Sequence, residues 1–192
     1  PLEETCRAMN WVINQGLAHY RGTSQWSASQ IMEAYKICDK FNLIPPIVEQ
    51  THYNLMTRDL VEREYRDLFA RYKMGTTVWS PLESGVLAGR YLNGIPEDSR
   101  FNIKHDGAST DIKPYLDHKK EWDEKLLKLK DIAEKKLNCS LAQLSLAWIL
   151  ANPDVSTIIL GASRVSQLEE NVKALEVYKK LDKDILLEIE KI

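Results

Sequence analysis

The chain has 192 residues, of which 44% are hydrophobic and 28% charged, a composition typical of a soluble globular protein. This length suffices for one sizeable domain or for part of a larger one. The net charge of −2 argues against broad binding to nucleic acid, and no apolar run approaches the roughly 18 residues of a membrane span. We therefore expect no nucleic-acid partner and no direct insertion into a membrane.

The cysteines and the first residues indicate the compartment and the kind of chain. Cys6, Cys38 and Cys139 lack the spacing of a metal site or a disulfide framework, and the first two fall on apolar helical stripes. Reduced thiols and the lack of a signal-like N-terminus favour a cytoplasmic protein. The sequence opens at Pro1 without Met and runs straight into a helix, which is typical of a fragment cut from a longer protein.

Short apolar strands alternate with amphipathic helices in the first half of the chain. A first helix is expected to run from Pro1 to Gly16, and Ser27 with Gln30 forms a capping box before a second. A third helix is expected over residues 60–72. The four strands predicted in the whole chain cover residues 17–24, 47–50, 76–80 and 156–160.

The second half is predominantly helical. Residues 81–117 show no sustained periodicity, which predicts a long active-site loop. Two helices follow, the second starting after Ser140, and Asp182 is expected to cap the last helix. The helix between strand 156–160 and Asp182 carries an apolar stripe made of Val165, Leu168, Val172 and Leu175.

This order of elements predicts an α/β fold with four parallel strands joined by right-handed crossovers. Such strands could form an open doubly wound sheet or half of a (β/α)8 TIM-type barrel. Polar residues follow the strands at Ser24, Gln50, Ser80 and Ser163, at the carboxyl ends where barrels place their active sites. This favours the barrel, although an open sheet binds ligands at the same ends.

Two groups of residues could bind a ligand. Ser24, Gln50 and Trp79 could fix a carboxamide and stack on an aromatic ring, or Trp79 could be core and Gln50 a loop cap. The segment from Gly161 through Ser163 and Arg164 precedes a helix and could bind a phosphate, or serve only as a turn and helix cap. The four histidines lack metal spacing, and no obvious general acid or base is present.

Four segments, in this order, resemble the aldo-keto reductases, and most closely the branch that contains the voltage-gated potassium channel β subunits. They are "YRGTSQWSASQIMEAY", "PPIVEQTHYNLMTRD", "WSPLESGVLAGRY…GIPEDSR" and "LGASRVSQLEEN". The resemblance covers residues 1–192 as a single partial domain. It implies the C-terminal half of a (β/α)8 barrel, bound NADP(H) and hydride transfer to an aldehyde or ketone.

The resemblance also implies a role for individual residues. Ser24 and Gln50 would hold the nicotinamide carboxamide, and Trp79 would stack on the nicotinamide ring. The residues implied along the pyrophosphate are Ser80, Pro81, Leu82 and Ser84, with Arg90 and Arg100 reaching over it. Those implied around the 2′-phosphate are Gly161, Ser163, Arg164 and Gln167, with Glu170 and Asn171 on the adenine side.

The sequence departs from the family pattern at Gln25, where the channel subunits usually carry Arg, and at Asp98, where an aromatic residue is common. The family's catalytic Asp, Tyr, Lys and His (or Asn) lie on the first four barrel strands, and we expect this chain to begin after them. Tyr20 does not match the motif of the catalytic tyrosine. No catalytic residue is therefore assigned.

Two functions are compatible with these residues. The first is the cofactor-binding half of an NADPH-dependent oxidoreductase that reduces aldehydes or ketones. The second is an auxiliary cytoplasmic subunit of a voltage-gated potassium channel, with NADPH as a redox sensor. Family resemblance implies a homo-oligomer, a tetramer. The strands next to Tyr20 and Ile159 would lack a neighbour, so the isolated half is expected to be poorly stable or to self-associate.

Overall fold

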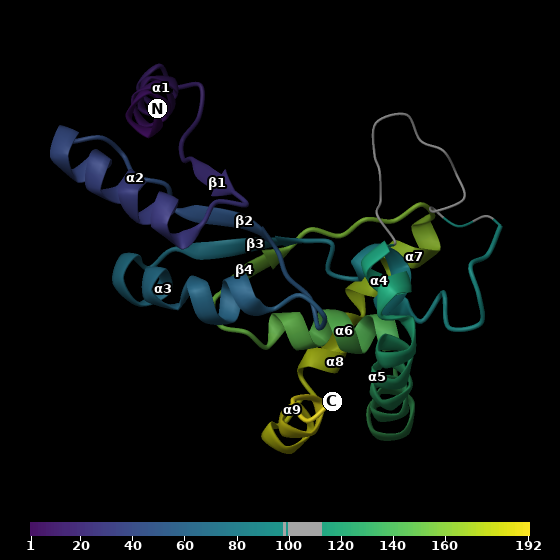
Figure 1. The fold of residues 1–192 in the computed structure, drawn as a ribbon. Coiled ribbons are helices and arrows are strands. Elements are labelled where there is room, and N and C mark those ends of the chain that lie inside the picture. The colour runs from purple at the N-terminus through teal and green to yellow at the C-terminus, as the bar shows by residue number, and fades with distance from the viewer. Residues whose placement is uncertain (98, 100–112) are drawn as a thin grey trace. The chain divides into compact units, whose positions relative to one another are not determined.

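The computed structural model describes residues 1–97, 99 and 113–192, which form two compact units (Figure 1). The first unit contains residues 1–53, 57–79 and 153–159. The second contains residues 54–56, 160–192 and the described part of 80–152. Arg100 and Asp98, which sequence reasoning singled out, lie outside the described residues. Among the described residues no helix is long and apolar enough to cross a bilayer.

The first unit is built on a four-stranded parallel sheet in the order β1-β2-β3-β4. Its strands are β1 (Gly22–Ser24), β2 (Val48–His52), β3 (Gly75–Trp79) and β4 (Val155–Ile158). All four predicted strands are confirmed, and so is their parallel arrangement. The strand predicted over residues 17–24 is shorter than expected, because its ladder with β2 begins only at Gly22. A Cβ at Gly22 would lie 2.7 Å from the carbonyl oxygen of Val48, so this close approach requires glycine.

The helices of the first unit are α1 (Leu2–Asn14), α2 (Ala28–Phe41), the π-helical turn η1 (Leu60–Glu64) and α3 (Arg66–Tyr72). The predicted capping box is present. The Ser27 side chain accepts from the Gln30 N–H, and the Gln30 side chain accepts from the Ser27 N–H. The helix expected over residues 60–72 is divided at Tyr65 into η1 and α3. The Tyr65 N–H donates to the Leu60 carbonyl across a wide π-turn, and this extra residue breaks the regular helical repeat.

One face of the sheet is covered by helices. Figure 1 shows α2 and α3 along the same side of the strands. Residues on that side, such as Glu49 and Thr51 on β2, are buried, whereas Gln50 between them is exposed. Cys6 on α1 and Cys38 on α2 are buried in one hydrophobic cluster, which confirms their expected place in the core.

Helices make up the regular structure of the second unit. They are the 3-10 helix η2 (Glu83–Ala88), α4 (Lys113–Asp117), α5 (Lys119–Ile132), the π-turn η3 (Ala133–Leu137), α6 (Leu141–Leu150), α7 (Val165–Val172), α8 (Ala174–Tyr178) and α9 (Lys183–Ile189). Ser140 caps α6 in a second capping box, and Asp182 caps α9 as predicted. Residues 81–117 are not without structure, since η2 and α4 occupy part of them. These elements are too short to show helical periodicity in the sequence.

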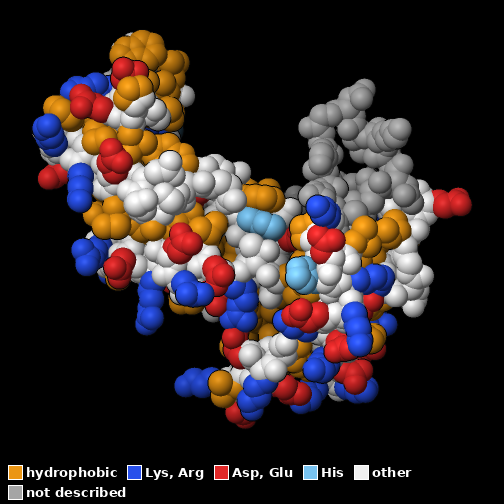
Figure 2. Space-filling model, in the orientation of Figure 1, with side chains coloured by type: hydrophobic (Ala, Val, Ile, Leu, Met, Phe, Trp, Pro, Cys, Tyr) orange, Lys and Arg blue, Asp and Glu red, His pale blue; other side chains and the backbone are white. Residues whose placement is uncertain are grey.

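The apolar stripe predicted on the helix after Arg164, which the structure divides into α7 and α8, is exposed rather than buried. Val165, Leu168, Val172 and Leu175 all face solvent. The packed side of α7 and α8 carries Asn171, Ala174 and Val177 instead, and α8 packs against the almost entirely buried helix α6. Charged side chains of both signs are interspersed over α5 and α9 (Figure 2).

Candidate functional site

The three residues predicted to hold an aromatic ring with a carboxamide lie on three neighbouring strands: Ser24 ends β1, Trp79 ends β3, and Gln50 lies in the middle of β2. Ser24 and Gln50 are direct partners in the β1–β2 ladder. Gln50 pairs with Thr77 on β3, and Trp79 lies two residues further on, so all three side chains belong to the same face of the sheet. Ser24 and Gln50 are exposed on that face. The structure thus brings together an exposed hydroxyl, an exposed amide and an indole.

His52 is a neighbour of this group that sequence reasoning did not single out for it. Its imidazole stacks on the Trp79 indole with ring centroids 4.3 Å apart and an interplanar angle of 16°. His52 and Trp79 are partners in the β2–β3 ladder. The stacking orients the indole from one side. Strand register alone could have indicated this pair, because both residues end their strands.

The turn after β1 is fixed against β2 by the backbone. Gln25 adopts a left-handed conformation with φ of 57°. Its N–H donates to the Gln50 carbonyl at 3.1 Å, and its side-chain oxygen accepts from the His52 N–H at 2.9 Å. A non-glycine residue with positive φ persists only where its surroundings hold it. Such conformations are concentrated at binding sites.

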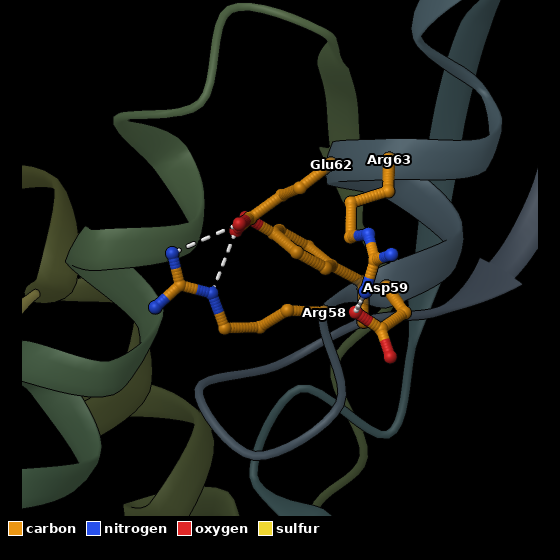
Figure 3. A network of polar contacts seen from close by, with 5 residues as sticks. Arg58, Asp59, Glu62 and Arg63 are labelled. Atoms are coloured by element: carbon orange, nitrogen blue, oxygen red, sulfur yellow. Dashed lines mark hydrogen bonds and ion pairs between the residues drawn. The ribbon is translucent and has the colours of Figure 1, made fainter.

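A polar network holds the segment that follows β2. Glu62 on η1 accepts two hydrogen bonds from Arg58, both at 2.9 Å (Figure 3). It also accepts one from the Tyr53 hydroxyl at 2.7 Å. Arg63 and Asp59 form a separate exposed pair at 3.3 Å. Two parallel bonds from a guanidinium fix orientation as well as distance. This network therefore fixes the start of η1 relative to the buried Tyr53 ring.

In the second unit, a tight turn carries Ser80, Pro81, Leu82 and Ser84. Ser80, Glu83 and Ser84 all have positive φ, between 44° and 54°. Asn54, which is fully buried, donates to the Ser80 carbonyl at 3.0 Å and to the Glu83 carboxylate at 2.6 Å. The Tyr91 hydroxyl donates to the Ser84 carbonyl at 2.8 Å. These contacts hold a turn whose backbone can closely approach a ligand.

A second segment of this unit leads into α7. Gly161, Ser163 and Arg164 are exposed, and α7 begins at Val165, so Ser163 is not the N-cap. The Gln167 side-chain oxygen accepts from both the N–H and the hydroxyl of Ser163, at 2.9 and 3.1 Å. Within the described residues no side chain caps α7. Its first turn therefore keeps the donor character that suits an anion.

The remaining predicted residues have different environments. Glu170 is exposed, and its carbonyl accepts from the Gln143 amide at 3.0 Å. Asn171 is buried, and Arg90 is half-buried. No group of three or more His, Cys, Asp or Glu suited to a metal occurs in the described part of the chain.

Tyr115, Lys119 and Asp123 form a hydrogen-bonded cluster of a phenol, an ammonium group and a carboxylate. The Tyr115 hydroxyl donates to Asp123 at 2.6 Å and accepts from Lys119 at 3.1 Å. Burial, together with the Asp123 bond, raises the pKa of Tyr115. The ring is 2% exposed. This cluster fixes α4 to α5, and both of its hydrogen bonds engage the Tyr115 hydroxyl.

The fold and these residues define a family. The model of the aldo/keto reductase family matches residues 1–192, and the chain belongs to this family. Its four parallel strands with surrounding helices are part of the (β/α)8 barrel expected from the resemblance.

Two relatives are similar over nearly the whole chain. A probable voltage-gated potassium channel subunit beta from Oryza sativa subsp. japonica is 47% identical over 194 residues, covering 99% of this chain. A protein of the same description from Arabidopsis thaliana is 46% identical over 196 residues and covers 100% of the chain. In both comparisons the match spans only 57% of the relative's length.

Proposed function

We propose that this chain is the cofactor-binding half of an NADPH-dependent oxidoreductase that reduces aldehydes or ketones. The observation that carries the proposal is the shared face of Ser24, Gln50 and Trp79 on three neighbouring strands. A hydroxyl next to an amide complements the donors and acceptor of a carboxamide, and an indole suits the nicotinamide ring. The donor set therefore fits the nicotinamide end of NADPH.

For the charged end of NADPH, the family resemblance implies residues of the second unit. The turn at Ser80, Pro81, Leu82 and Ser84 would line the pyrophosphate, with Arg90 and Arg100 as cationic partners. Gly161, Ser163, Arg164 and Gln167 would surround the 2′-phosphate, and Glu170 and Asn171 would lie on the adenine side. The uncapped start of α7 beside Arg164 supports this assignment. When bound, NADPH supplies the hydride.

In this proposal, the side chains of this half bind the cofactor and orient its nicotinamide ring. Trp79, backed by His52, would hold one face of the nicotinamide ring, and Gln50 with Ser24 would set its rotation. Orientation of a reactant in this way lowers the activation barrier, because the reactant has already lost its rotational and translational entropy on binding. The proton donor is not assigned in this chain, and Tyr115 is unsuited because its hydroxyl is buried and already bonded to Asp123.

The test of the proposal is turnover by the longer protein that contains this sequence. Purified protein is incubated with NADPH and a series of aldehydes and ketones, and the absorbance of the reduced nicotinamide is followed. We expect aldehyde-dependent oxidation of NADPH and little oxidation of NADH. Binding of NADPH without turnover of any carbonyl compound would contradict the enzymatic part.

A second candidate function rests on the two relatives described as probable potassium channel β subunits. In this alternative the protein is a cytoplasmic auxiliary subunit that associates as a homo-oligomer with the cytoplasmic part of a potassium channel, and NADPH acts as a redox sensor. Affinity purification of the full-length protein from its own cells distinguishes the two. Recovery of a channel subunit supports the alternative, and its absence from repeated purifications contradicts it.

A further inference from the structure

Glu49 is a buried carboxylate in the middle of a sheet. It lies on β2 with no exposed surface, directly before Gln50 in the sequence. Because side chains alternate along a strand, Glu49 faces the covered side of the sheet while Gln50 faces the open side. A carboxylate without access to water is costly unless its oxygens are well bonded. Burial raises the pKa of Glu49, and its hydrogen bonds oppose that rise.

The described hydrogen bonds of Glu49 come from Thr23 on β1 and from the turn that follows this strand. The Thr23 hydroxyl donates to one carboxylate oxygen, and the Trp26 N–H donates to the other at 3.2 Å. The Gln25 backbone is close enough to lower the carboxyl pKa as well. None of the described contacts of Glu49 is to Lys or Arg. The two oxygens of one carboxylate therefore bind both ends of the segment from Thr23 to Trp26.

This turn begins at Ser24, one of the residues proposed to bind the nicotinamide carboxamide. Ser24 lies between Thr23 and Gln25, and Gln25 is held with positive φ by its bonds to Gln50 and His52. On the far side, the buried Tyr65 hydroxyl donates to the Trp26 carbonyl at 2.5 Å. The turn is thus held by contacts with Glu49 and Tyr65 on the side of the sheet that the helices cover. The bonds of Gln25 to Gln50 and His52 fix it to β2 as well.

We propose that Glu49 is a positioning residue that fixes the Thr23–Trp26 turn, and with it Ser24 next to Gln50, for recognition of the nicotinamide carboxamide. The inference rests on the proposed function and adds a residue that does not touch the cofactor. A carboxylate suits this role because both of its oxygens accept. Two hydrogen bonds to an ionised acceptor are stronger and more directional than bonds to a neutral one.

The test compares two ligands that differ only at the end that Ser24 would contact. The longer protein is titrated with NADPH and with 2′-phospho-ADP-ribose, which keeps the adenosine, its 2′-phosphate and the pyrophosphate but lacks nicotinamide. For Glu49→Ala we expect the Kd for NADPH to rise about 10-fold, corresponding to one or two lost charged hydrogen bonds, and the Kd for 2′-phospho-ADP-ribose to stay unchanged.

Two milder variants and one control complete the series. Glu49→Gln can accept from the Trp26 N–H and donate to the Thr23 oxygen, so it should restore most of the affinity for NADPH. Thr23→Val keeps the shape and removes one bond, so it should show a smaller loss and remains usable if Glu49→Ala does not fold. Glu33→Ala, which removes an exposed carboxylate on α2, should change neither affinity.

Each outcome decides between the claims. Equal losses for both ligands in Thr23→Val and Glu49→Ala would overturn the inference, because they would indicate general loss of structure. Unchanged NADPH affinity in both variants would also overturn it. If the wild-type protein binds neither ligand, the proposed function itself fails, and this result is distinct because it precedes any comparison of variants.

Discussion

Gln167 and Ser163 are joined by two hydrogen bonds to one oxygen, at 2.9 Å from the Ser163 N–H and 3.1 Å from its hydroxyl. The pair closes a ring at the start of α7 and fixes the backbone directly before Arg164, which has extended geometry. Gln167 therefore has a structural role in addition to its proposed contact with the 2′-phosphate. It sets the direction in which the segment from Gly161 to Arg164 enters the helix.

Replacing this glutamine tests whether the ring matters for anion binding. Gln167→Glu keeps the oxygen that accepts from Ser163 but adds a negative charge beside the proposed 2′-phosphate. We expect the Kd for NADPH to rise about 10-fold and the Kd for NADH to change little, because the added charge lies beside the 2′-phosphate, which NADH lacks. Gln167→Ala, which only opens the ring, should cost less. Fluorescence titration measures the Kd values of both cofactors for each variant and for wild type. An equal loss of affinity for NADPH and NADH would contradict the assignment.

Asn54 anchors the turn at Ser80 and Glu83, so its removal should destabilise the protein. Asn54→Ala removes the two hydrogen bonds that this buried side chain donates to the Ser80 carbonyl and the Glu83 carboxylate, and we expect a loss of about 1–3 kcal/mol in the free energy of unfolding. Chemical denaturation of the longer protein measures this loss. Asn93→Ala, at an exposed asparagine, is the matched control. A loss no larger than that of the control would show that the turn does not depend on Asn54.

Tyr65 makes the stability sensitive to alkaline pH. Burial, and to a lesser extent the Glu49 charge, raise its pKa from 10.0 to about 12. Because the folded state holds this proton more tightly than the unfolded state, the stabilising contribution is complete below about pH 10 and is lost as the pH rises towards 12.

The variant Tyr65→Phe lacks both the titrating group and the hydrogen bond to Trp26. It should be less stable than wild type at neutral pH by about 1 kcal/mol. The difference between the two proteins should shrink as the pH passes from 10.0 towards 12. Urea denaturation at several pH values gives the two curves. A difference that stays constant over this range would contradict the raised pKa.

The exposed stripe of Val165, Leu168, Val172 and Leu175 should drive self-association of the chain when it is expressed alone. Contiguous exposed apolar surface of this kind marks a contact surface. Val172→Lys combined with Leu175→Lys should shift the isolated chain towards monomer in analytical ultracentrifugation. The matched control is the pair Glu169→Lys and Glu176→Lys, which alters charge on the same helices. A wild-type chain that is already monomeric and unfolds cooperatively would contradict both this prediction and the expected weakness of the isolated half.

The sequence predicts the regular elements of this fold well, for identifiable physical reasons. Ser27 and Ser140 begin helices through capping boxes whose partners lie three residues away, so local chemistry suffices. The order of the strands follows from their alternation with helices. The turn at Gln25 could not be predicted, because its positive φ depends on Glu49 and His52 from another strand.

The sequence also could not predict which side of α7 and α8 is buried. A stripe at helical spacing indicates an apolar face but does not say whether another segment covers it, and here Ala174 and Val177 make the packed side instead. In the same way, Ser24, Gln50 and Trp79 could be grouped from strand ends alone, whereas the stacking of His52 on Trp79 required the register of β2 and β3. Local signals are strong in this chain, and pairing between distant segments is weakly encoded.

The central claim is that the protein recognises NADPH through its 2′-phosphate, and the most direct measurement is the ratio of the Kd values for NADH and NADPH in wild type and in Arg164→Ala. Loss of a charge-assisted contact should raise the Kd for NADPH about 10- to 100-fold and leave NADH unchanged, so the ratio falls by the same factor. Lys173→Ala, at the other end of α7, should leave the ratio as in wild type. A wild-type protein that binds the two cofactors equally, or an Arg164→Ala variant that weakens both to the same extent, would contradict the account.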